Sequence, residues 1–195
     1  FVGIGGIGMS GIAEVLHNMG FKVSGSDINE NANVKMLREM GIKISIGHDE
    51  SNVEYADVIV YTSAARDDNP ELVRARQERK PVIKRGEMLS ELMRLKFAVA
   101  VAGSHGKTTT TSMVAEIVKA AKLDPTILIG GRLNSTNNNA SYGKSNIMIA
   151  EADESDRSFL MLYPSIAVIT NIDYEHMESY KDFDDVKESF TEFAN

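Results

Sequence analysis

A glycine-rich turn stands between an apolar run and an amphipathic stretch in the second half of the chain. The apolar run is Phe97–Ala102, the turn is Gly103-Ser104-His105-Gly106-Lys107-Thr108-Thr109, and helical periodicity continues to about Ala121. Glycines let backbone N–H groups close around an anion, and a helix N-terminus adds a favourable dipole. Lys107 would reach the outer phosphates, and the Thr108 hydroxyl would hold Mg²⁺. The stretch therefore predicts an ATP site on a strand–loop–helix unit.

The loop departs from the usual G-x-x-x-x-G-K-[ST] pattern, because Val101 stands five positions before Gly106. It is a shortened GxxGKT. A glycine turn that only caps an ordinary helix is the alternative interpretation, and the flanking strand and helix signals argue against it.

The first glycine loop of the chain lies at its start, ahead of the turn at Gly103–Thr109, which is the second. Gly3, Gly5 and Gly8 form G-x-G-x-x-G before a helical pattern, and Asp27 follows 19 residues after Gly8 at the end of an expected strand. Such a loop approaches a pyrophosphate, and such an acid accepts hydrogen bonds from a ribose hydroxyl. NAD and a UDP-sugar share these groups, so both remain open. A purely structural glycine turn is the third interpretation.

Strand and helix patterns alternate along the whole chain. This alternation predicts an α/β fold with parallel sheets and right-handed crossovers. We place a domain boundary near Leu95, which gives domains 1–95 and 96–195. The polar stretch Gly130–Asn146 lacks an apolar period in its centre, and we expect a loop there that is mobile or ordered by ligand.

Composition excludes several classes of function. The net charge of −7 argues against nucleic acid or an anionic membrane as the main partner. No cysteine is present, which fits a reducing cytoplasm, and no apolar run approaches the roughly 20 residues that span a bilayer. The absence of cysteine leads us to expect a cytoplasmic location. The chain opens inside a strand pattern and stops inside a helical one, so we also expect a fragment of a longer protein.

Two further features follow expected strands in the second half. Glu151 directly follows the strand Ile147–Ala150, at the sheet edge where α/β proteins bind ligands and where Mg²⁺ could find a hard oxygen ligand. His176 follows the strand Ile166–Thr170. From the residues alone, the acids near Glu151 could form a solvated loop, and a lone histidine is more often a structural group.

The motifs together resemble one family along the whole chain. The segments that carry the resemblance to the Mur ligases of peptidoglycan synthesis are Gly3–Ala13, Asp67–Glu71, Gly103–Thr111, Glu151–Asp156 and Asn171–His176. It implies that 1–95 is a Rossmann-like, UDP-sugar-binding domain. It also implies that 96–195 is the first, incomplete part of a central ATP-binding P-loop domain.

The resemblance also implies roles for individual residues. Lys107, Glu151 and His176 would be catalytic, and Thr108, Glu151 and His176 would hold the metal. Residues Gly103–Thr109 would bind ATP. The residues implied for the UDP-sugar are Gly5, Gly6, Ile7 and Gly8 at the diphosphate, Asp27, Ser63 and Ala64 at ribose and uracil, and His48 and Asn171 at the sugar or lactyl end.

The implied activity is an ATP- and Mg²⁺-dependent ligase that joins L-alanine to UDP-N-acetylmuramate through an acyl phosphate. We expect the fragment alone to be inactive, and a homodimer is compatible with the sequence. A ligase that adds a recycled peptide to the same UDP-sugar shares much of the signature. An NAD-dependent oxidoreductase and a non-catalytic nucleotide sensor are the alternatives from other classes.

Overall fold

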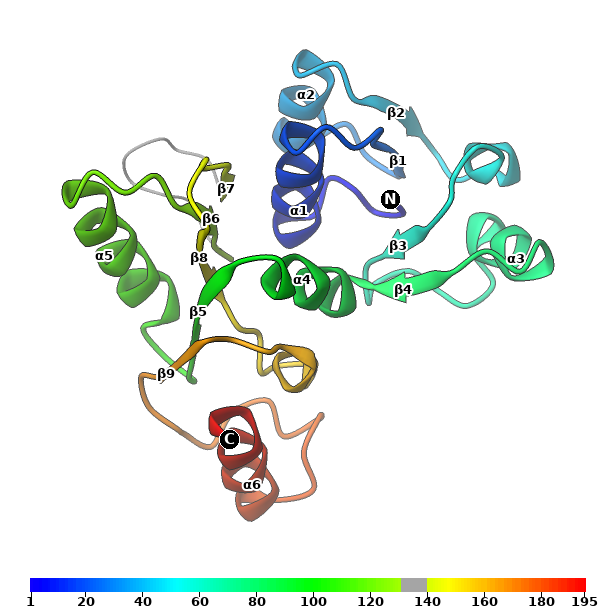
Figure 1. Cartoon of the computed structure of the whole chain (residues 1–195). Coiled ribbons are helices and arrows are strands. Elements are labelled where there is room, and N and C mark those ends of the chain that lie inside the picture. The colour runs from blue at the N-terminus through cyan, green and yellow to red at the C-terminus, as the bar shows by residue number, and fades with distance from the viewer. Residues whose placement is uncertain (131–139) are drawn as a thin grey trace. The chain divides into compact units, whose positions relative to one another are not determined.

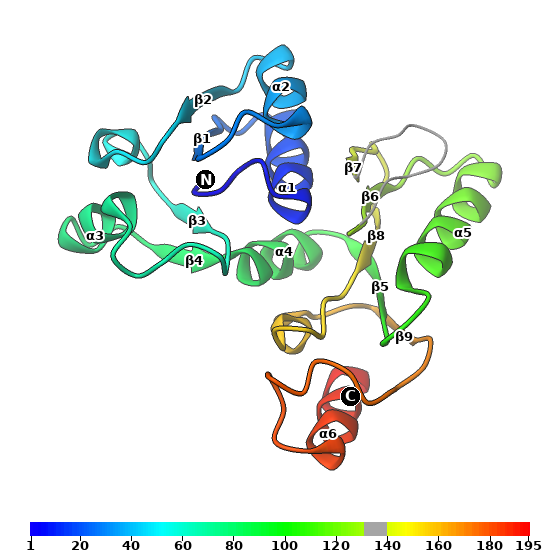
Figure 2. The same cartoon turned by 180° about the vertical axis from the view of Figure 1, so that it is seen from behind.

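The computed structural model describes residues 1–130 and 140–195, which form two compact units, Phe1–Met88 and Leu89–Asn195 (Figures 1 and 2). The units divide inside α4 (Arg85–Arg94), whereas the domain boundary near Leu95 stays a prediction. In the part of the chain that is described, no helix is both long and apolar enough to cross a membrane. Each unit is described by itself below.

Unit 1 alternates short strands and helices. Its elements before α4 are α1 (Ile7–Asn18), β1 (Ser24–Asp27), α2 (Ala32–Glu39), β2 (Lys43–Ile46), the 3-10 helix η1 (Glu50–Val53), β3 (Ile59–Tyr61), α3 (Pro70–Gln77) and β4 (Val82–Lys84). β1 pairs with β2 and β3 with β4, all in parallel. Val2 bridges Ser26 on one side and Tyr61 on the other, so the first residues run between the two strand pairs. The strand expected at Phe1 is reduced to this bridge, because Gly3 turns the chain at once with φ of 78°.

An apolar cluster in unit 1 joins α1, α2 and β2 through the buried side chains of Ala13, Leu37 and Ile44. Helix starts follow local chemistry, because the Asn31 side chain accepts from the N–H of Val34 and the Asn69 side chain caps α3 in front of Pro70.

Unit 2 is built on a five-stranded sheet. Its elements are β5 (Phe97–Ala102), α5 (Lys107–Ala120), β6 (Thr126–Leu128), β7 (Ala140–Ser141), β8 (Ile147–Glu151), the 3-10 helix η2 (Ser158–Met161), β9 (Ile166–Ile169) and α6 (Phe183–Ala194). The strand order is β7-β6-β8-β5-β9, with β9 at one border. All pairs are parallel except β6 with β7, which is antiparallel.

The β7 strand corrects one expectation. The sequence predicted a loop over the whole polar stretch from Gly130 to Asn146. β7 lies inside that stretch, and Ala140 pairs with Leu128. Residues 131–139, at the centre of the predicted loop, lie outside the described residues. Alternation could not reveal β7, because a two-residue strand has no period.

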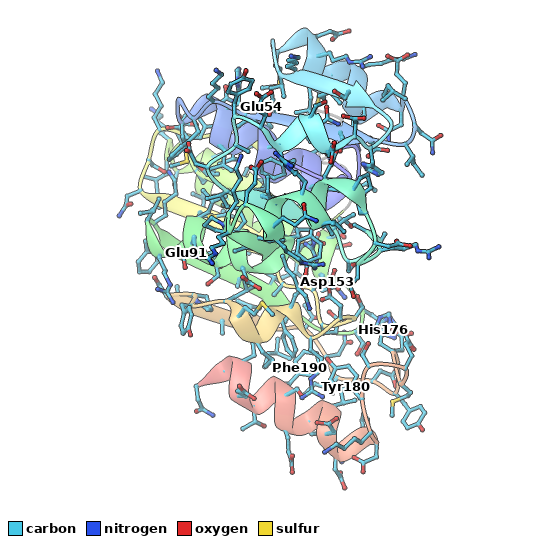
Figure 3. All side chains as sticks on the ribbon, turned by 90° about the vertical axis from the view of Figure 1, so that its right-hand side faces the viewer. Glu54, Glu91, Asp153, His176, Tyr180 and Phe190 are labelled. Atoms are coloured by element: carbon cyan, nitrogen blue, oxygen red, sulfur yellow. The ribbon has the colours of Figure 1, made fainter. Side chains whose placement is uncertain are left out.

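Strand ends in unit 2 converge where the phosphate loop starts. β5 lies between β8 and β9, with Val101 opposite Glu151 and Ala102 opposite Ile169. α5 lies along one face of the sheet (Figure 1), with Ala115 packed in a cluster of sheet residues. α6 packs through Phe190 against Phe159 of η2, at 5.1 Å between ring centroids (Figure 3).

Candidate functional site

The phosphate loop opens into the N-terminus of α5. Gly103 and Gly106 have φ of 132° and 80°, conformations that favour glycine. Gly106 is the N-cap of α5, and no side chain caps the helix there. The first N–H groups of a helix have no partner within it. Those of Lys107, Thr108 and Thr109 therefore face the position where an anion would bind.

Lys107 lies across its own loop. Its Nζ donates to Gly103 O at 2.6 Å and to Glu154 Oε1 at 2.7 Å, with Ser104 O at 3.4 Å. Glu154 is 3% exposed, and its Oε2 is buried without a hydrogen-bond partner among the described residues. Sequence reasoning favoured Glu151 among the acids after β8 and missed Glu154. Its ion pair with Lys107 joins residues 47 apart, which no local pattern reports.

Glu151 has the surroundings expected of a metal ligand. Its Oε2 accepts from the N–H of Gly130 at 2.8 Å, and the Thr108 hydroxyl is hydrogen-bonded to the carboxylate. Burial raises the pKa of Glu151, although the bonds from Thr108 and Gly130 and the charge of Lys107 oppose that shift. Its Oε1 is buried without a partner in the described part of the chain. An orphaned carboxylate oxygen beside a hydroxyl fits Mg²⁺, which takes few protein ligands and keeps several waters.

His176 lies at the same acid as Lys107. Its Nε2 is 3.7 Å from Glu154 Oε1, the oxygen that Lys107 contacts, and its Nδ1 is 3.7 Å from Glu178. The residue has a left-handed backbone, with φ of 56°. Figure 3 labels His176 and Tyr180 on the segment between β9 and α6. No group of three or more His, Asp or Glu arranged to hold a metal occurs within residues 1–130 and 140–195.

Asn171 lies against the phosphate loop. Its Oδ1 accepts from the N–H of His105 at 2.9 Å, and its Nδ2 donates to the carbonyl of the same residue at 2.9 Å. Its own backbone carbonyl accepts from the N–H of Ser104. Two of the seven residues predicted to bind ATP therefore have their N–H groups bonded within the protein.

The first glycine loop is held by polar side chains from β1 and α2. Asp27 Oδ2 accepts from the N–H of Gly5 at 2.8 Å, and Asp27 Oδ1 accepts from that of Asn29. Asn31 and Asn33 both donate to the carbonyl of Gly5. Gly6 is the N-cap of α1, again with no side-chain cap, and Ile7 and Gly8 form the first turn. Asp27 thus lies where the sequence predicted and is hydrogen-bonded to the loop.

The side chain of Arg85 places a cation beside this loop, and the sequence gave no reason to select this residue. A Cβ added at Gly8 would come within 3.1 Å of Arg85 Nη1. A guanidinium at this position suits a phosphate group. Arg85 is far from the loop in sequence and starts α4, so only the fold reveals the proximity.

His48 belongs to a buried polar cluster. Ser26 Oγ donates to Glu71 Oε2 at 2.6 Å and lies 3.0 Å from His48 Nδ1. Because the serine has one hydrogen and gives it to Glu71, His48 Nδ1 must be the donor in that contact. Asn52 Nδ2 donates to Glu71 Oε1 at 2.6 Å. His48 is therefore oriented by Ser26 next to Asp27.

Ser63 and Ala64 lie in the exposed turn after β3. The N–H of Ala64 is 3.5 Å from the Thr62 hydroxyl, and the carbonyl of Thr62 accepts from the N–H of Ala65. The turn follows the carboxyl end of β3, as Asp27 ends β1, and both strands flank Val2. This is the edge of an α/β sheet at which ligands bind.

Comparison of the sequence relates this chain to known proteins. Residues 1–97 match the Mur ligase family, catalytic domain, and residues 101–195 match the Mur ligase middle domain. A UDP-N-acetylmuramate–L-alanine ligase from Myxococcus xanthus is 60% identical over 195 residues, and one from Aquifex aeolicus is 57% identical. Each alignment covers 100% of this chain but 41% and 43% of the relative, so the chain spans less than half of their length.

Solved structures agree with the sequence matches. UDP-N-acetylmuramate–alanine ligase from Thermotoga maritima superposes with a TM-score of 0.91 at 38% identity, over 99% of this chain and 46% of that one. A UDP-N-acetylmuramate:L-alanyl-γ-D-glutamyl-meso-diaminopimelate ligase from Neisseria meningitides gives 0.87 at 28%, over 98% and 65%. Two adjoining domain matches that together reach from residue 1 to residue 195, with these relatives, make the chain a member of the Mur ligase family.

Proposed function

We propose that the chain is part of an ATP-dependent ligase that joins L-alanine to the carboxylate of UDP-N-acetylmuramate. The observation that carries this proposal is the phosphate loop, with Lys107 above it, Glu151 at the end of β8 and His176 on the segment after β9, in a chain whose relatives bear that activity in their names. The activity belongs to the complete protein, since the chain spans 41–43% of those relatives.

Unit 1 would bind the UDP part of the substrate. The diphosphate would lie against Gly5–Gly8 at the N-terminus of α1, with the Arg85 guanidinium nearby. Asp27 and the turn at Ser63 and Ala64 would contact ribose and uracil. His48, oriented by Ser26, would contact the sugar or lactyl end.

Unit 2 would bind ATP. A free carboxylate is a poor electrophile, so its oxygen attacks the γ-phosphorus, ADP leaves, and an acyl phosphate forms. The amine of L-alanine then attacks the acyl carbon and displaces phosphate, which gives the amide. Lys107 would move its ammonium from Gly103 O and Glu154 toward the transferring phosphoryl group and balance its charge. Mg²⁺, held by Thr108 and Glu151 with His176 near the γ-phosphate, would supply further charge neutralisation.

L-Alanine is favoured over a peptide as the acceptor. The curated relatives from Myxococcus xanthus and Aquifex aeolicus that carry the alanine name are 60% and 57% identical, and the solved alanine ligase is 38% identical, whereas the solved peptide-adding ligase is 28% identical. The sequence-based alternative of an NAD-dependent oxidoreductase has no counterpart among these relatives.

The test uses the complete protein that contains this chain. Phosphate release from ATP is measured with UDP-N-acetylmuramate and either L-alanine or the tripeptide L-alanyl-γ-D-glutamyl-meso-diaminopimelate. We expect release with L-alanine, and mass spectrometry should detect the alanyl product. Turnover with the tripeptide but not with L-alanine would instead support the function of the peptide-adding ligases. NAD binding without UDP-sugar binding would refute both ligase functions.

A further inference from the structure

Several hydrogen bonds join the segment after β9 to the phosphate loop. We call Thr170, Asn171 and Asp173 the loop strap. Asn171 bonds both backbone groups of His105, and Thr170 Oγ1 donates to the carbonyl of His105 at 2.7 Å. The N–H of Asp173 donates to Ser104 Oγ at 2.9 Å. The strap thus fixes the tip of the loop from one side.

A close backbone approach at Gly103 is an independent sign of the same arrangement. A Cβ added there would lie 2.1 Å from Thr170 Oγ1 and 2.9 Å from the carbonyl oxygen of Asn171. Gly103 also has φ of 132°, which L side chains rarely adopt. The loop therefore needs glycine at this position because the strap lies against it.

The strap determines which amides remain for a phosphate. It engages the N–H groups of Ser104 and His105. A trans peptide points its carbonyl and the following N–H in opposite directions, so holding the His105 carbonyl toward the strap turns the N–H of Gly106 away from it. The N–H of Gly106 and those of the first turn of α5 then point to the same anion position.

We propose that Asn171, with Thr170, is a positioning residue for the ATP phosphates and makes no contact with the UDP-sugar. Both polar atoms of its side chain are already bonded to His105. The inference deepens the proposed function and rests on it, since ATP is the nucleotide concerned. It differs from the role at the sugar or lactyl end that the family resemblance implies for Asn171.

The experiment measures KM for ATP and for UDP-N-acetylmuramate in the complete protein. We expect Asn171→Ala to raise the KM for ATP about tenfold, the effect of losing two hydrogen bonds that preorganise the loop, and to leave the KM for the UDP-sugar within about twofold. Asn171→Asp keeps the acceptor for the His105 N–H but turns an oxygen toward the His105 carbonyl, so its effect should be at least as large. Asn195→Ala, which removes an amide bonded to Thr191 O at the end of α6, is the matched control.

Thr170 provides a pair of variants that separates positioning from folding. Thr170→Ser keeps the hydroxyl and should retain the wild-type KM for ATP, whereas Thr170→Val removes the donor to His105 O and should raise it. A raised KM for the UDP-sugar with an unchanged KM for ATP in Asn171→Ala would overturn the proposal. It would favour a direct contact between Asn171 and the UDP-sugar instead. Unchanged values for both substrates would overturn it as well.

Calorimetry with ATP and Mg²⁺ alone distinguishes failure of the strap from failure of the proposed function. A complete protein that binds ATP but does not ligate would refute the ligase assignment. In that protein, weaker ATP binding in Asn171→Ala would still support the strap, and unchanged binding would refute it.

Discussion

The two glycine loops of this chain look alike in sequence but are held by opposite chemistry. In the first loop, the carboxylate of Asp27 accepts from Gly5 and two asparagines donate to the Gly5 carbonyl. In the second loop, the amide of Asn171 bonds His105, and the ammonium of Lys107 closes on Gly103 O. The first loop thus has a carboxylate bonded to it and the Arg85 guanidinium beside Gly8, whereas the second has an ammonium that is paired with Glu154. The difference teaches that glycine spacing predicts an anion site, and that the side chains holding the loop determine how much negative charge it can take.

The largest expected effect concerns the cation of the second loop. Lys107→Ala in the complete protein should lower ligation by about a thousandfold or more, because the ammonium balances charge on the moving phosphoryl group. UDP-sugar affinity, measured by calorimetry, should not change. Lys119→Ala, at the other end of α5, is the control. Ligation at the wild-type rate in Lys107→Ala would remove the ATP role of the second loop.

The next effect tests how tightly the second loop is packed. Gly103→Ala should lower ATP affinity about thirtyfold or more, because the added Cβ meets Thr170 Oγ1 and backbone atoms of Asn171. Gly106→Ala meets nothing within 4 Å and costs only a left-handed backbone, so we expect a loss of about tenfold or less. Calorimetry with ATP provides both values. Equal losses in the two variants would show that the strap does not restrict the loop.

The same pair of substitutions in the first loop should be milder. A Cβ at Gly5 would lie 2.8 Å from Asn31 Nδ2 and from Cγ2 of the buried Val34, and 2.9 Å from Asp27 Oδ2, whereas the closest atom at Gly6 is 3.5 Å away. We expect Gly5→Ala to weaken UDP-sugar binding about tenfold and Gly6→Ala to have less effect. Neither variant should alter ATP affinity. If Gly5→Ala weakens ATP binding instead, the assignment of ligands to loops is wrong.

The last effect concerns folding stability rather than ligand affinity, and it lies in α1, the helix after the first loop. Burial raises the pKa of Glu14 on α1 from 4.5 to about 7, and its Oε2 has no hydrogen-bond partner in the described residues. The folded state then binds this proton more tightly than the unfolded state. The proton on Glu14 therefore contributes at most roughly 3 kcal/mol to the free energy of unfolding. This contribution is complete below about pH 4.5 and is lost as the pH rises to about 7.

Thermal unfolding between pH 4.5 and 8 measures that contribution. Glu14→Gln, which cannot ionise, should flatten the decline of the melting temperature with rising pH and should raise the melting temperature at pH 8. Glu39→Gln, on the exposed side of α2, should leave the decline as it is. A decline in Glu14→Gln as steep as that of the unaltered protein would assign the pH dependence to another group.

Sequence reasoning succeeded where a single local pattern contains the information. The apolar run Phe97–Ala102 became β5 with the predicted bounds, and the helical periodicity after the glycine-rich turn became α5, which ends at Ala120. Glu151 lies at the end of β8, as the apolar run before it predicted, and its role as a metal ligand stays a prediction. These features depend on residues that are neighbours in the chain.

The remainder could not be predicted, because it depends on contacts between distant residues. Glu154 meets Lys107 across 47 residues, and Asn171 meets His105 across 66. Asn171 was placed at the substrate by the family motif alone, since nothing in its neighbourhood tells which of two ligands it serves. The position of Arg85 beside Gly8 follows from the crossover of unit 1. In each case the decisive partner is brought close by sheet topology.

β9 forms a border of its sheet, with β5 on its inner side and, within residues 1–130 and 140–195, no strand on its outer side. A border strand frays more easily than an interior one and offers unpaired backbone groups to any incoming segment. Thr170 and Asn171 directly follow β9. How rigidly they hold the phosphate loop therefore depends on how stably β9 pairs with the rest of the sheet. Addition of one more strand there, from whatever polypeptide supplies it, would stiffen ATP recognition without touching ATP.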